Sequence, residues 1–348
     1  MKVIIDDKIP FIARVAEKLF DEVVYLPGAE FKNRAEVKDA DALIVRTRTH
    51  CDRALLGGSK VKFIATATIG FDHINAEDLR TLGIEWTNCP GCNASSVGQY
   101  VRNCLVLICQ RDGCRMEDFT VGVVGYGHVG KEVCKALKDA GCKLLVNDPP
   151  LEETRGADVE LVSLDKLAKL CNVITFHTPL ITGGAHPTYH LADEAFFGKV
   201  ACHPVIINAA RGGVVDEQAL QRASGDKRVG DMIIDTWEGE PHIDLALMNK
   251  AFVATPHIAG YSADGKSNAT RMALRAVCRF FEIHIADEKE FIELTAPSSL
   301  PADCVPTGDV MTDWLRLYNP ADDSMRLKHN PEMFEKLRGN YPLRRETF

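Results

Sequence analysis

The N-terminal part of the chain alternates short apolar runs with amphipathic stretches. VIID near residue 4, VVYLP, ALIVRT from Ala42 and KFIATAT from Lys62 are typical of buried strands, whereas FIARVAEKLF has the apolar spacing of a helix. Strands that alternate with helices are typical of a parallel α/β sheet. We therefore predict a small parallel sheet here.

A long helix is predicted next, and a second and larger α/β array follows it. From Asn93 to Cys109, after a capping residue at Asn93 or Ser95, apolar residues recur at three- and four-residue spacing. The later predicted strands are TVGVVG, KLLVND, NVITFHT, PVIINAA, MIIDTW and FVATPH. The later predicted helices run from His128 to Ala140, Leu164 to Leu170, Asp216 to Ala223 and Ala263 to Phe281. This pattern predicts a second parallel sheet.

Length and composition indicate several domains. A chain of 348 residues with 46% apolar residues exceeds what one hydrophobic core usually holds, so we expect two or three domains. A charged stretch and a Pro- and Ser-rich stretch follow residue 283 and mark a boundary. The tail beyond has too few apolar residues for a core of its own, and we expect it to need a partner surface.

Charge and apolar runs restrict the partners. The net charge of −8 and scattered Lys and Arg residues argue against nucleic acid. No apolar run approaches the roughly 20 residues of a membrane span, and the start lacks a signal-peptide pattern. We expect a cytoplasmic protein without a membrane partner.

The twelve cysteines have a simple interpretation. Cys89 and Cys92 form a CxxC, but no second CxxC and no His pair at zinc spacing accompanies it. We expect reduced thiols and no metal site.

The clearest local signal is a GxGxxG motif between a predicted strand and a predicted helix. In a dinucleotide site the first glycine, Gly125, permits the tight turn, Gly127 lets the backbone approach a pyrophosphate, and Gly130 lets the helix pack closely. The helix N-terminus, which includes His128 and Val129, offers amide donors to the phosphates. The alternative is an ordinary tight turn.

The next predicted strand ends in Asp148, at the distance where an acidic side chain binds a ribose diol. A carboxylate there would repel a 2′-phosphate, and no Arg follows directly, so NAD is favoured over NADP. The alternative is that Asp148 is simply a solvated residue at the end of a strand. The ordered strand, glycines, helix, strand and acid favour the dinucleotide site.

Three loops after later strands carry groups for the oxidation of a 2-hydroxy acid. His257 in TPHIAGY can take the hydroxyl proton, and Arg211 in NAARGG can bind a carboxylate through two donors. Glu240 in DTWEGEP can orient the imidazole and support its protonated form. Alone, each residue also fits a structural role, as a hydrogen-bonding His, a helix-capping Arg or a solvated Glu.

At these residues the sequence resembles the D-2-hydroxyacid dehydrogenase family. The shared motifs are the GxGxxG, HTPL from His177, NAARGGVVDE from Asn208, EGEP from Glu238 and TPHIAGY from Thr255, in order from residue 1 to about 283. The resemblance implies that His257, Glu240 and Arg211 are catalytic. It also implies that Asp148, Thr178, Asp235 and Gly260 line NAD.

The resemblance implies a fold as well. A Rossmann-type doubly wound sheet domain, residues 93–255, would be inserted in a smaller flavodoxin-like α/β substrate (lid) domain built from residues 1–92 and 256–283. Residues 284–348 would form a small C-terminal dimerisation region, so we expect a homodimer. Gln99 stands in the linking helix where an acidic residue is common in the family.

DALIVRTRT, FIATATIGFDHI, CPGCNASSV and HIAGYSADGK resemble a branch of the family that acts on a phosphorylated four-carbon acid. That implies oxidation of 4-phospho-D-erythronate on the route to pyridoxal 5′-phosphate, with Thr47, Thr68 and Tyr261 in contact with the substrate. Two alternatives stay open. One is a family member that acts on 3-phosphoglycerate or glycerate, and the other is an NAD-sensing binding protein of the corepressor kind.

Overall fold

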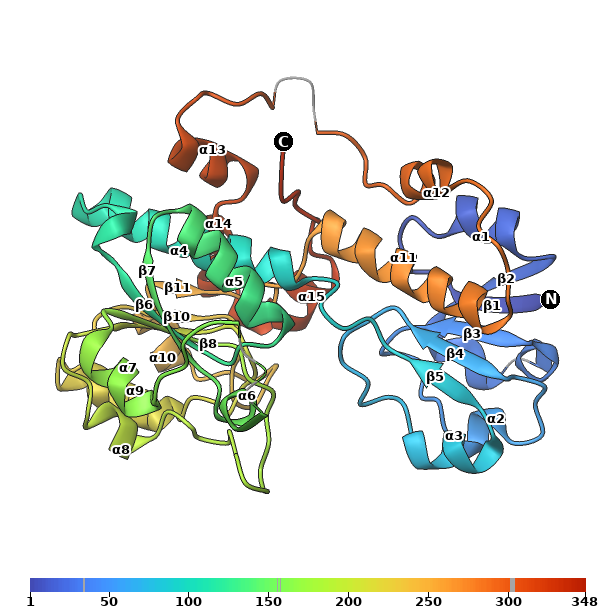
Figure 1. Cartoon of the computed structure of the whole chain (residues 1–348), viewed down its shortest axis with the longest axis horizontal. Helices are drawn as coiled ribbons and strands as arrows, with labels where there is room; N and C mark the ends of the chain where they lie inside the picture. The colour runs from blue at the N-terminus through green and yellow to red at the C-terminus, as the bar shows by residue number, and fades with distance from the viewer. Residues whose placement is uncertain (34, 155, 157, 301–303) are drawn as a thin grey trace. The chain divides into compact units, whose positions relative to one another are not determined.

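The protein is described by a computed structural model of residues 1–348, in which all residues except 34, 155, 157 and 301–303 are described. The chain divides into two compact units. Unit 1 comprises Met1–Asn93 and Ser262–Leu300, and unit 2 comprises Ala94–Tyr261 and Pro301–Phe348. Each unit has its own parallel sheet (Figure 1). The prediction of two parallel α/β sheets is confirmed.

The sheet of unit 1 has five parallel strands in the order β2-β1-β3-β4-β5. They are β1 (Lys2–Asp6), β2 (Glu22–Leu26), β3 (Ala42–Val45), β4 (Phe63–Thr66) and β5 (Glu85–Thr87). This is the order of flavodoxin-like sheets. Strands β3 and β4 are buried along their whole length, as expected for a parallel sheet covered on both faces.

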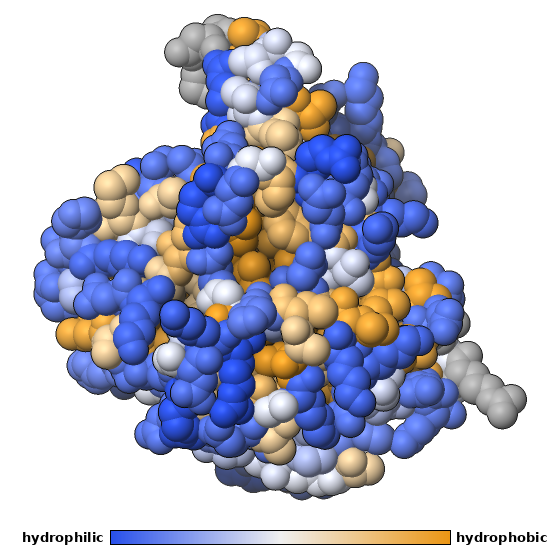
Figure 2. Space-filling model, turned by 90° about the vertical axis from the view of Figure 1, so that its left-hand side faces the viewer, coloured by the Kyte–Doolittle hydropathy of each residue, from blue (hydrophilic) through white to orange (hydrophobic). Residues whose placement is uncertain are grey.

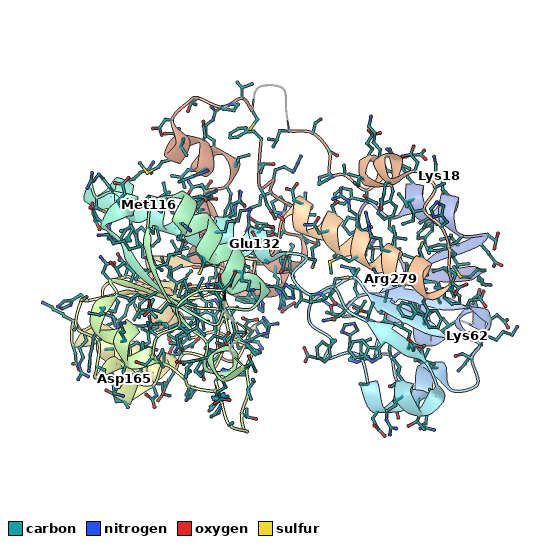
Figure 3. The ribbon with its side chains drawn as sticks, in the orientation of Figure 1. Lys18, Lys62, Met116, Glu132, Asp165 and Arg279 are labelled. Carbon is teal, nitrogen blue, oxygen red and sulfur yellow. The ribbon has the colours of Figure 1, made fainter. Side chains whose placement is uncertain are left out.

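The helices of unit 1 come from two distant parts of the chain. They are α1 (Ala13–Leu19), α2 (Arg53–Leu56), α3 (Ala76–Leu82), α11 (Ala263–Phe280) and α12 (Glu288–Leu294), with 3-10 turns at η1 (Gly28–Asn33) and η2 (Ala35–Asp39). Helix α11 begins after Ser262, whose hydroxyl caps the amide of Gly265, and it packs on β3 and β4. Lys18 of α1, labelled in Figure 3, pairs with Glu290 of α12.

The sheet of unit 2 has six parallel strands in the order β11-β10-β9-β8-β6-β7. They are β6 (Thr120–Val124), β7 (Lys143–Asn147), β8 (Val173–Phe176), β9 (Val205–Asn208), β10 (Met232–Ile234) and β11 (Val253–Ala254). Leu161 adds a single bridge to Val146 of β7. Strand β7 lies on one side of β6, and β8 and the later strands lie on the other side, so the strand order reverses between β6 and β8. Ligands bind at such switch points in doubly wound sheets.

Helices cover this sheet. They are α4 (Ala94–Asp112), α5 (His128–Asp139), α6 (Pro149–Thr154), α7 (Leu164–Leu170), α8 (Glu194–Phe197), α9 (Glu217–Gly225) and α10 (Leu245–Lys250), with η3 at Met116–Asp118. Helices α4 and α5 lie side by side (Figure 1). The predicted long helices therefore exist, with ends that differ from the predicted ones by one to three residues.

The C-terminal tail packs on unit 2. It contains α13 (Val310–Leu317), α14 (Pro320–His329), η4 (Pro331–Met333) and α15 (Phe334–Gly339). Tyr318, Leu327 and Phe334 are buried in the two hydrophobic clusters of unit 2. The partner surface that the tail needs is thus supplied within the same chain.

The boundaries of the compact units differ from those of the expected domains. Residues 256–261 belong to unit 2, because their loop is bonded to the end of β10. Residues 284–300 belong to unit 1, where Phe291 joins the core, while the rest of the tail belongs to unit 2.

The surface is mostly polar on the face seen in Figure 2, where smaller apolar areas lie among hydrophilic side chains. No helix in the described ranges has both the length and the apolar character needed to cross a bilayer. All twelve cysteines, including Cys89 and Cys92, are free thiols.

Candidate active site

The carboxyl ends of the strands of unit 2 meet at one edge of the sheet. The last residues of five strands are in register across the sheet, in the sequence Val124, Phe176, Asn208, Ile234 and Ala254. All strands are parallel, so the loops that follow them leave from the same edge. Every predicted catalytic and cofactor residue belongs to unit 2 and follows one of its strands.

The glycine loop after β6 has the geometry that a pyrophosphate requires. A Cβ on Gly130 would lie 1.9 Å from the carbonyl oxygen of Gly125, so only glycine allows α5 to start this close to β6. A Cβ on Gly127 would meet nothing within 4 Å, which leaves open space at the helix N-terminus. Gly127 caps α5 without a side-chain hydrogen bond, so the amides of His128 and Val129 are not capped by that residue.

Asp148 follows β7 beside this loop. Its Oδ2 accepts the amide of Tyr126 at 2.7 Å and its Oδ1 accepts the amide of Leu151 at 3.0 Å. These bonds hold the carboxylate in place, and each oxygen keeps a further lone pair for a ribose hydroxyl.

Two polar atoms after β8 lack partners within the described part of the chain. They are Oγ1 of Thr178 and Nδ1 of His177, and both are buried. A Cβ on Gly125 would lie 3.0 Å from Cγ2 of Thr178, which puts these atoms beside the glycine loop. Burial lowers the pKa of His177 to about 3, so the ring is neutral. Unpaired buried polar atoms call for an explanation, and a bound dinucleotide would supply one. The residues therefore fit NAD.

His257 and Glu240 form a hydrogen-bonded pair. Nδ1 of His257 lies 2.8 Å from Oε2 of Glu240, and the other carboxylate oxygen accepts the amide of Trp237 at 2.9 Å. Burial alone would raise the pKa of Glu240, but the bond and charge of His257, the Trp237 amide and the charge of Arg338 outweigh it and lower that pKa. Glu240 is therefore an ionised carboxylate that orients the imidazole.

The loop that carries His257 is supported by Asp235. Oδ1 of Asp235 accepts the amide of Ile258 at 2.7 Å and the hydroxyl of Thr255 at 2.6 Å, and Oδ2 accepts the amide of Ala259 at 3.0 Å. The OH of Tyr100 on α4 lies 2.9 Å from Oγ1 of Thr255. In this structure Asp235, predicted to line NAD, is a buried support of the loop that leads to Gly260 and Tyr261.

Arg211 is exposed in the loop after β9, and its Nη1 donates to the carbonyl of Ala210 at 2.8 Å. Among the described residues it has no ion pair, so the guanidinium is available to an anionic ligand. The next residue brings two loops together, because a Cβ on Gly212 would lie 1.9 Å from the carbonyl oxygen of Trp237. The Arg211 loop thus packs directly on the loop that carries Glu240.

Two predicted substrate residues lie in unit 1, after the neighbouring strands β3 and β4. Thr47 is exposed, and Thr68 is partly buried, with its Oγ1 2.9 Å from the carbonyl of Gly70 and 2.8 Å from Oγ1 of Thr66. Tyr261 lies in unit 2, with its ring against that of Tyr341 at 6.1 Å between centroids.

Sequence reasoning missed a polar cluster beside the Glu240 loop. The ring of His190 lies 3.0 Å from Glu238 and 3.6 Å from Asp216, and the side chains of Glu217 and Glu238 each accept the other's amide. The ligand atoms lie close enough together for a metal ion, and in this structure Nε2 of His190 is hydrogen-bonded to Glu238, while Nδ1 lies beyond hydrogen-bond distance from Asp216. In the sequence, the acidic residues of VVDE and EGEP were the signal that could have indicated this cluster.

The sequence also missed the tail. Arg338 lies near Glu240, and the buried Arg344 donates to the carbonyls of Ile258, Ala259 and Tyr261. Nothing in the tail's own pattern indicates these contacts, because they join residues more than 80 positions apart in the sequence.

Comparisons with known proteins agree with this geometry. Residues 106–259 match the D-isomer specific 2-hydroxyacid dehydrogenase, NAD binding domain. The chain is 51% identical to erythronate-4-phosphate dehydrogenase of Bacteroides thetaiotaomicron over 99% of this chain and 97% of that protein. It is 39% identical to the protein of the same name from Porphyromonas gingivalis, over 99% and 94%.

Solved structures share the fold. A D-2-hydroxyisocaproate dehydrogenase superposes with a TM-score of 0.69 at 23% identity, over 81% of this chain and 97% of that one. The NAD-bound 3-phosphoglycerate dehydrogenase of Entamoeba histolytica gives 0.64 at 27% identity, over 81% and 95%. The resemblance deduced from the motifs is confirmed, and the chain belongs to the D-isomer specific 2-hydroxyacid dehydrogenase family.

Proposed function

We propose that the chain oxidises 4-phospho-D-erythronate to 2-oxo-3-hydroxy-4-phosphobutanoate with NAD, a step of pyridoxal 5′-phosphate biosynthesis. The protein is an NAD-dependent dehydrogenase, and the near full-length similarity to proteins named erythronate-4-phosphate dehydrogenase supports this substrate. The observation that carries the chemistry is the 2.8 Å bond between His257 and Glu240, at the sheet edge that also holds the glycine loop.

The residues of the chain divide the work as follows. His257 uses Nδ1 for Glu240, which leaves Nε2 to take the proton of the substrate's 2-hydroxyl group. Glu240 stabilises the imidazolium that forms. Arg211 binds the substrate carboxylate through its planar pair of donors. NAD, when bound, accepts the hydride from the carbon that carries the hydroxyl group.

The remaining contacts are assigned as part of the same proposal. Gly125, Gly127, His128, Val129 and Gly130 hold the pyrophosphate, and Asp148 holds the ribose. Thr178, Asp235 and Gly260 line the rest of the cofactor. Thr47, Thr68 and Tyr261 contact the substrate, because hydroxyl donors suit a phosphorylated acid.

We also propose a homodimer in the cytoplasm, with residues 284–348 as the dimerisation region. Exposed apolar side chains in this region support a contact between copies, and they are Ile292, Val305, Val310, Met325, Leu343 and Phe348. Free thiols throughout support a reducing compartment. Light scattering after gel filtration tests the dimer, and a monomeric mass would remove that part of the proposal.

The substrate is tested by offering NAD with 4-phospho-D-erythronate, 3-phosphoglycerate or D-glycerate and following NADH formation. We expect the highest kcat/KM with 4-phospho-D-erythronate. In the same assay, His257→Asn should lower kcat by about 10²- to 10⁴-fold, because the base is lost, while the affinity for NAD remains.

Three results would contradict the proposal. A preference for 3-phosphoglycerate or D-glycerate would move the chain to another branch of the family. Full activity of His257→Asn would remove the base from the mechanism. No turnover of any of the three acids, with NAD binding intact, would favour the NAD-sensing binding protein.

A further inference from the structure

The C-terminal tail reaches the catalytic pair of unit 2. Nη1 of Arg338, on α15, lies 3.6 Å from Oε2 of Glu240. This is the same oxygen that bonds Nδ1 of His257 at 2.8 Å. One carboxylate oxygen therefore faces two basic side chains, one from the catalytic loop and one from the tail.

Arg338 is held where it can act on this oxygen. Its side chain is 30% exposed and that of Glu240 is 18% exposed, so water screens their interaction less than at an open surface. Glu335, one helical turn earlier, lies 3.8 Å from the same Nη1. Burial alone would lower the pKa of Arg338, but Tyr261, Glu240 and Glu335 together raise it, so the side chain remains a cation.

The segment that follows Arg338 is bonded to the catalytic loop through Arg344. The guanidinium of Arg344 donates to the carbonyls of Tyr261 at 2.7 Å and Ala259 at 2.6 Å, and it stacks on the ring of Tyr318 at 3.8 Å. The tail and the loop that follows His257 are therefore one connected structure, and Arg338 keeps its place relative to Glu240.

We propose that Arg338 is a positioning residue for the Glu240–His257 pair, and that the tail is thereby part of the catalytic apparatus. The inference rests on the proposed role of His257 as base. Arg338 holds the shared oxygen of Glu240 and opposes protonation of the imidazole, because its charge offsets part of the carboxylate's charge. Unprotonated imidazole, the form that accepts the substrate proton, is then available at lower pH.

Other charged groups also face the pair. Asp235 interacts with His257 from the end of β10, and Glu240 acts on Glu217 at the start of α9. Tyr261 lies on the Arg338 side. Apart from Arg338, these groups are neutral or acidic, so loss of Arg338 should make the pair easier to protonate.

The test compares Arg338→Met, Arg338→Lys and the parent across pH with saturating NAD. Arg338→Met keeps the apolar length and removes the charge, so the acid limb of the kcat/KM profile should move to higher pH by about half a unit or more. We expect kcat to fall while KM for NAD is unchanged. Arg338→Lys should keep the limb near its parental position.

The control is Arg222→Met, which also breaks an Arg–Glu pair in unit 2, but at an exposed site, where Arg222 Nε lies 2.8 Å from Glu194. It should leave the profile unchanged. An Arg338→Met profile that superimposes on that of the parent would overturn the proposal. So would a lower thermal stability without a displaced limb, because that result describes a merely structural ion pair.

A second readout separates this inference from the proposed substrate. The His257 ring can be titrated by NMR in the substrate-free protein, with His257→Asn to assign its signal. Its midpoint should be higher in Arg338→Met than in the parent, whichever acid the enzyme oxidises. If the parent turns over none of the offered acids but the midpoint moves, the positioning role stands and only the substrate is wrong. An unmoved midpoint overturns the positioning role.

Discussion

At the scale of single residues, the histidine that we propose as the base occupies an unusual backbone conformation. His257 has φ of 57°, in the left-handed region that residues other than glycine rarely adopt. Such a conformation persists only where surrounding contacts hold it, and here the amide of His257 donates to the carbonyl of Asp235 at 2.8 Å. The bond to Asp235 holds the backbone of His257, and the bond to Glu240 sets the direction of its imidazole.

A second residue with unusual chemistry lies close by. Glu217 is 8% exposed at the start of α9, and burial raises its pKa from 4.5 to about 7. Its carboxyl group accepts the amide of Glu238, two residues before Glu240. A carboxyl group of this kind is partly protonated at neutral pH and loses its proton just above it.

The raised pKa of Glu217 makes the stability of the folded protein depend on pH. Because the folded state holds the Glu217 proton to higher pH than the unfolded state, the favourable contribution is present at low pH and is lost as pH rises through about 7. Glu217→Gln should therefore be more stable than the parent at about pH 8, by up to about 3 kcal/mol, and similar to it at about pH 5. Chemical denaturation across that range measures the difference.

Glu160→Gln, at an exposed position, is the control for loss of one negative charge. It should track the parent across the range. If Glu217→Gln tracks it as well, Glu217 ionises normally.

The site residues whose position the sequence could predict are those that stand in a local motif. His257, Glu240 and Arg211 each follow a strand within a few residues, so a strand prediction also predicts their edge of the sheet. Glu217 could not be assigned in this way, because its pKa depends on burial that only the folded chain creates.

At the scale of elements, the tail and α4 form a common support for the loop that follows His257. Besides the loop carbonyls, Arg344 donates Nη2 to the carbonyl of Ser96 and Nε to Oε1 of Gln99, both on α4. Gln99 also donates Nε2 to the carbonyl of Arg345. An amide can accept and donate at once, which a carboxylate cannot, so Gln99 can accept from Arg344 and donate to the carbonyl of Arg345.

Arg344→Met should be strongly destabilising. It removes a buried cation that donates to the carbonyls of Ser96, Ile258, Ala259 and Tyr261, and we expect the free energy of unfolding to fall by about 3–5 kcal/mol. Activity should fall with it, because the loop after His257 loses its support. Thermal denaturation and kcat together measure the effect.

Arg326→Met, on the same tail but 56% exposed and paired with its helix neighbour Asp323, should change stability by less than about 1 kcal/mol. Equal effects of the two substitutions would mean that burial of Arg344 does not matter.

Element positions were predictable where periodicity was strong, and less so at element ends. The helix predicted to end at Cys109 continues to Asp112, because its last polar residues face solvent and Gly113, with φ of 68°, ends it. The placement of α13 to α15 on unit 2 was not predictable, since it depends on long-range packing of Tyr318, Leu327 and Phe334.

At the scale of the whole molecule, the proposed ligand contacts are distributed over two units with separate cores. The cores of unit 1 include Ile5, Ile44 and Leu43, and those of unit 2 include Val123, Ile206 and Ile234. All proposed contacts to NAD lie in unit 2, whereas Thr47 and Thr68 lie in unit 1. NAD and the substrate should therefore protect different segments of the two units from hydrogen exchange.

Hydrogen exchange can distinguish the segments bound by each ligand, because a ligand stabilises the segments that it binds against local opening. NAD alone should slow exchange in the glycine loop and in the loops after β8, β9, β10 and β11, with little change in the sheet of unit 1. Addition of 4-phospho-D-erythronate to the inactive His257→Asn variant with NAD should then slow exchange after β3 and β4, around Thr47 and Thr68. D-Erythronate without the phosphate is the matched control and should protect these segments less. Protection of unit 2 alone by the phosphorylated acid would show that Thr47 and Thr68 do not bind it, and the substrate contacts would have to be sought entirely among the loops that surround Arg211, Tyr261 and Arg338.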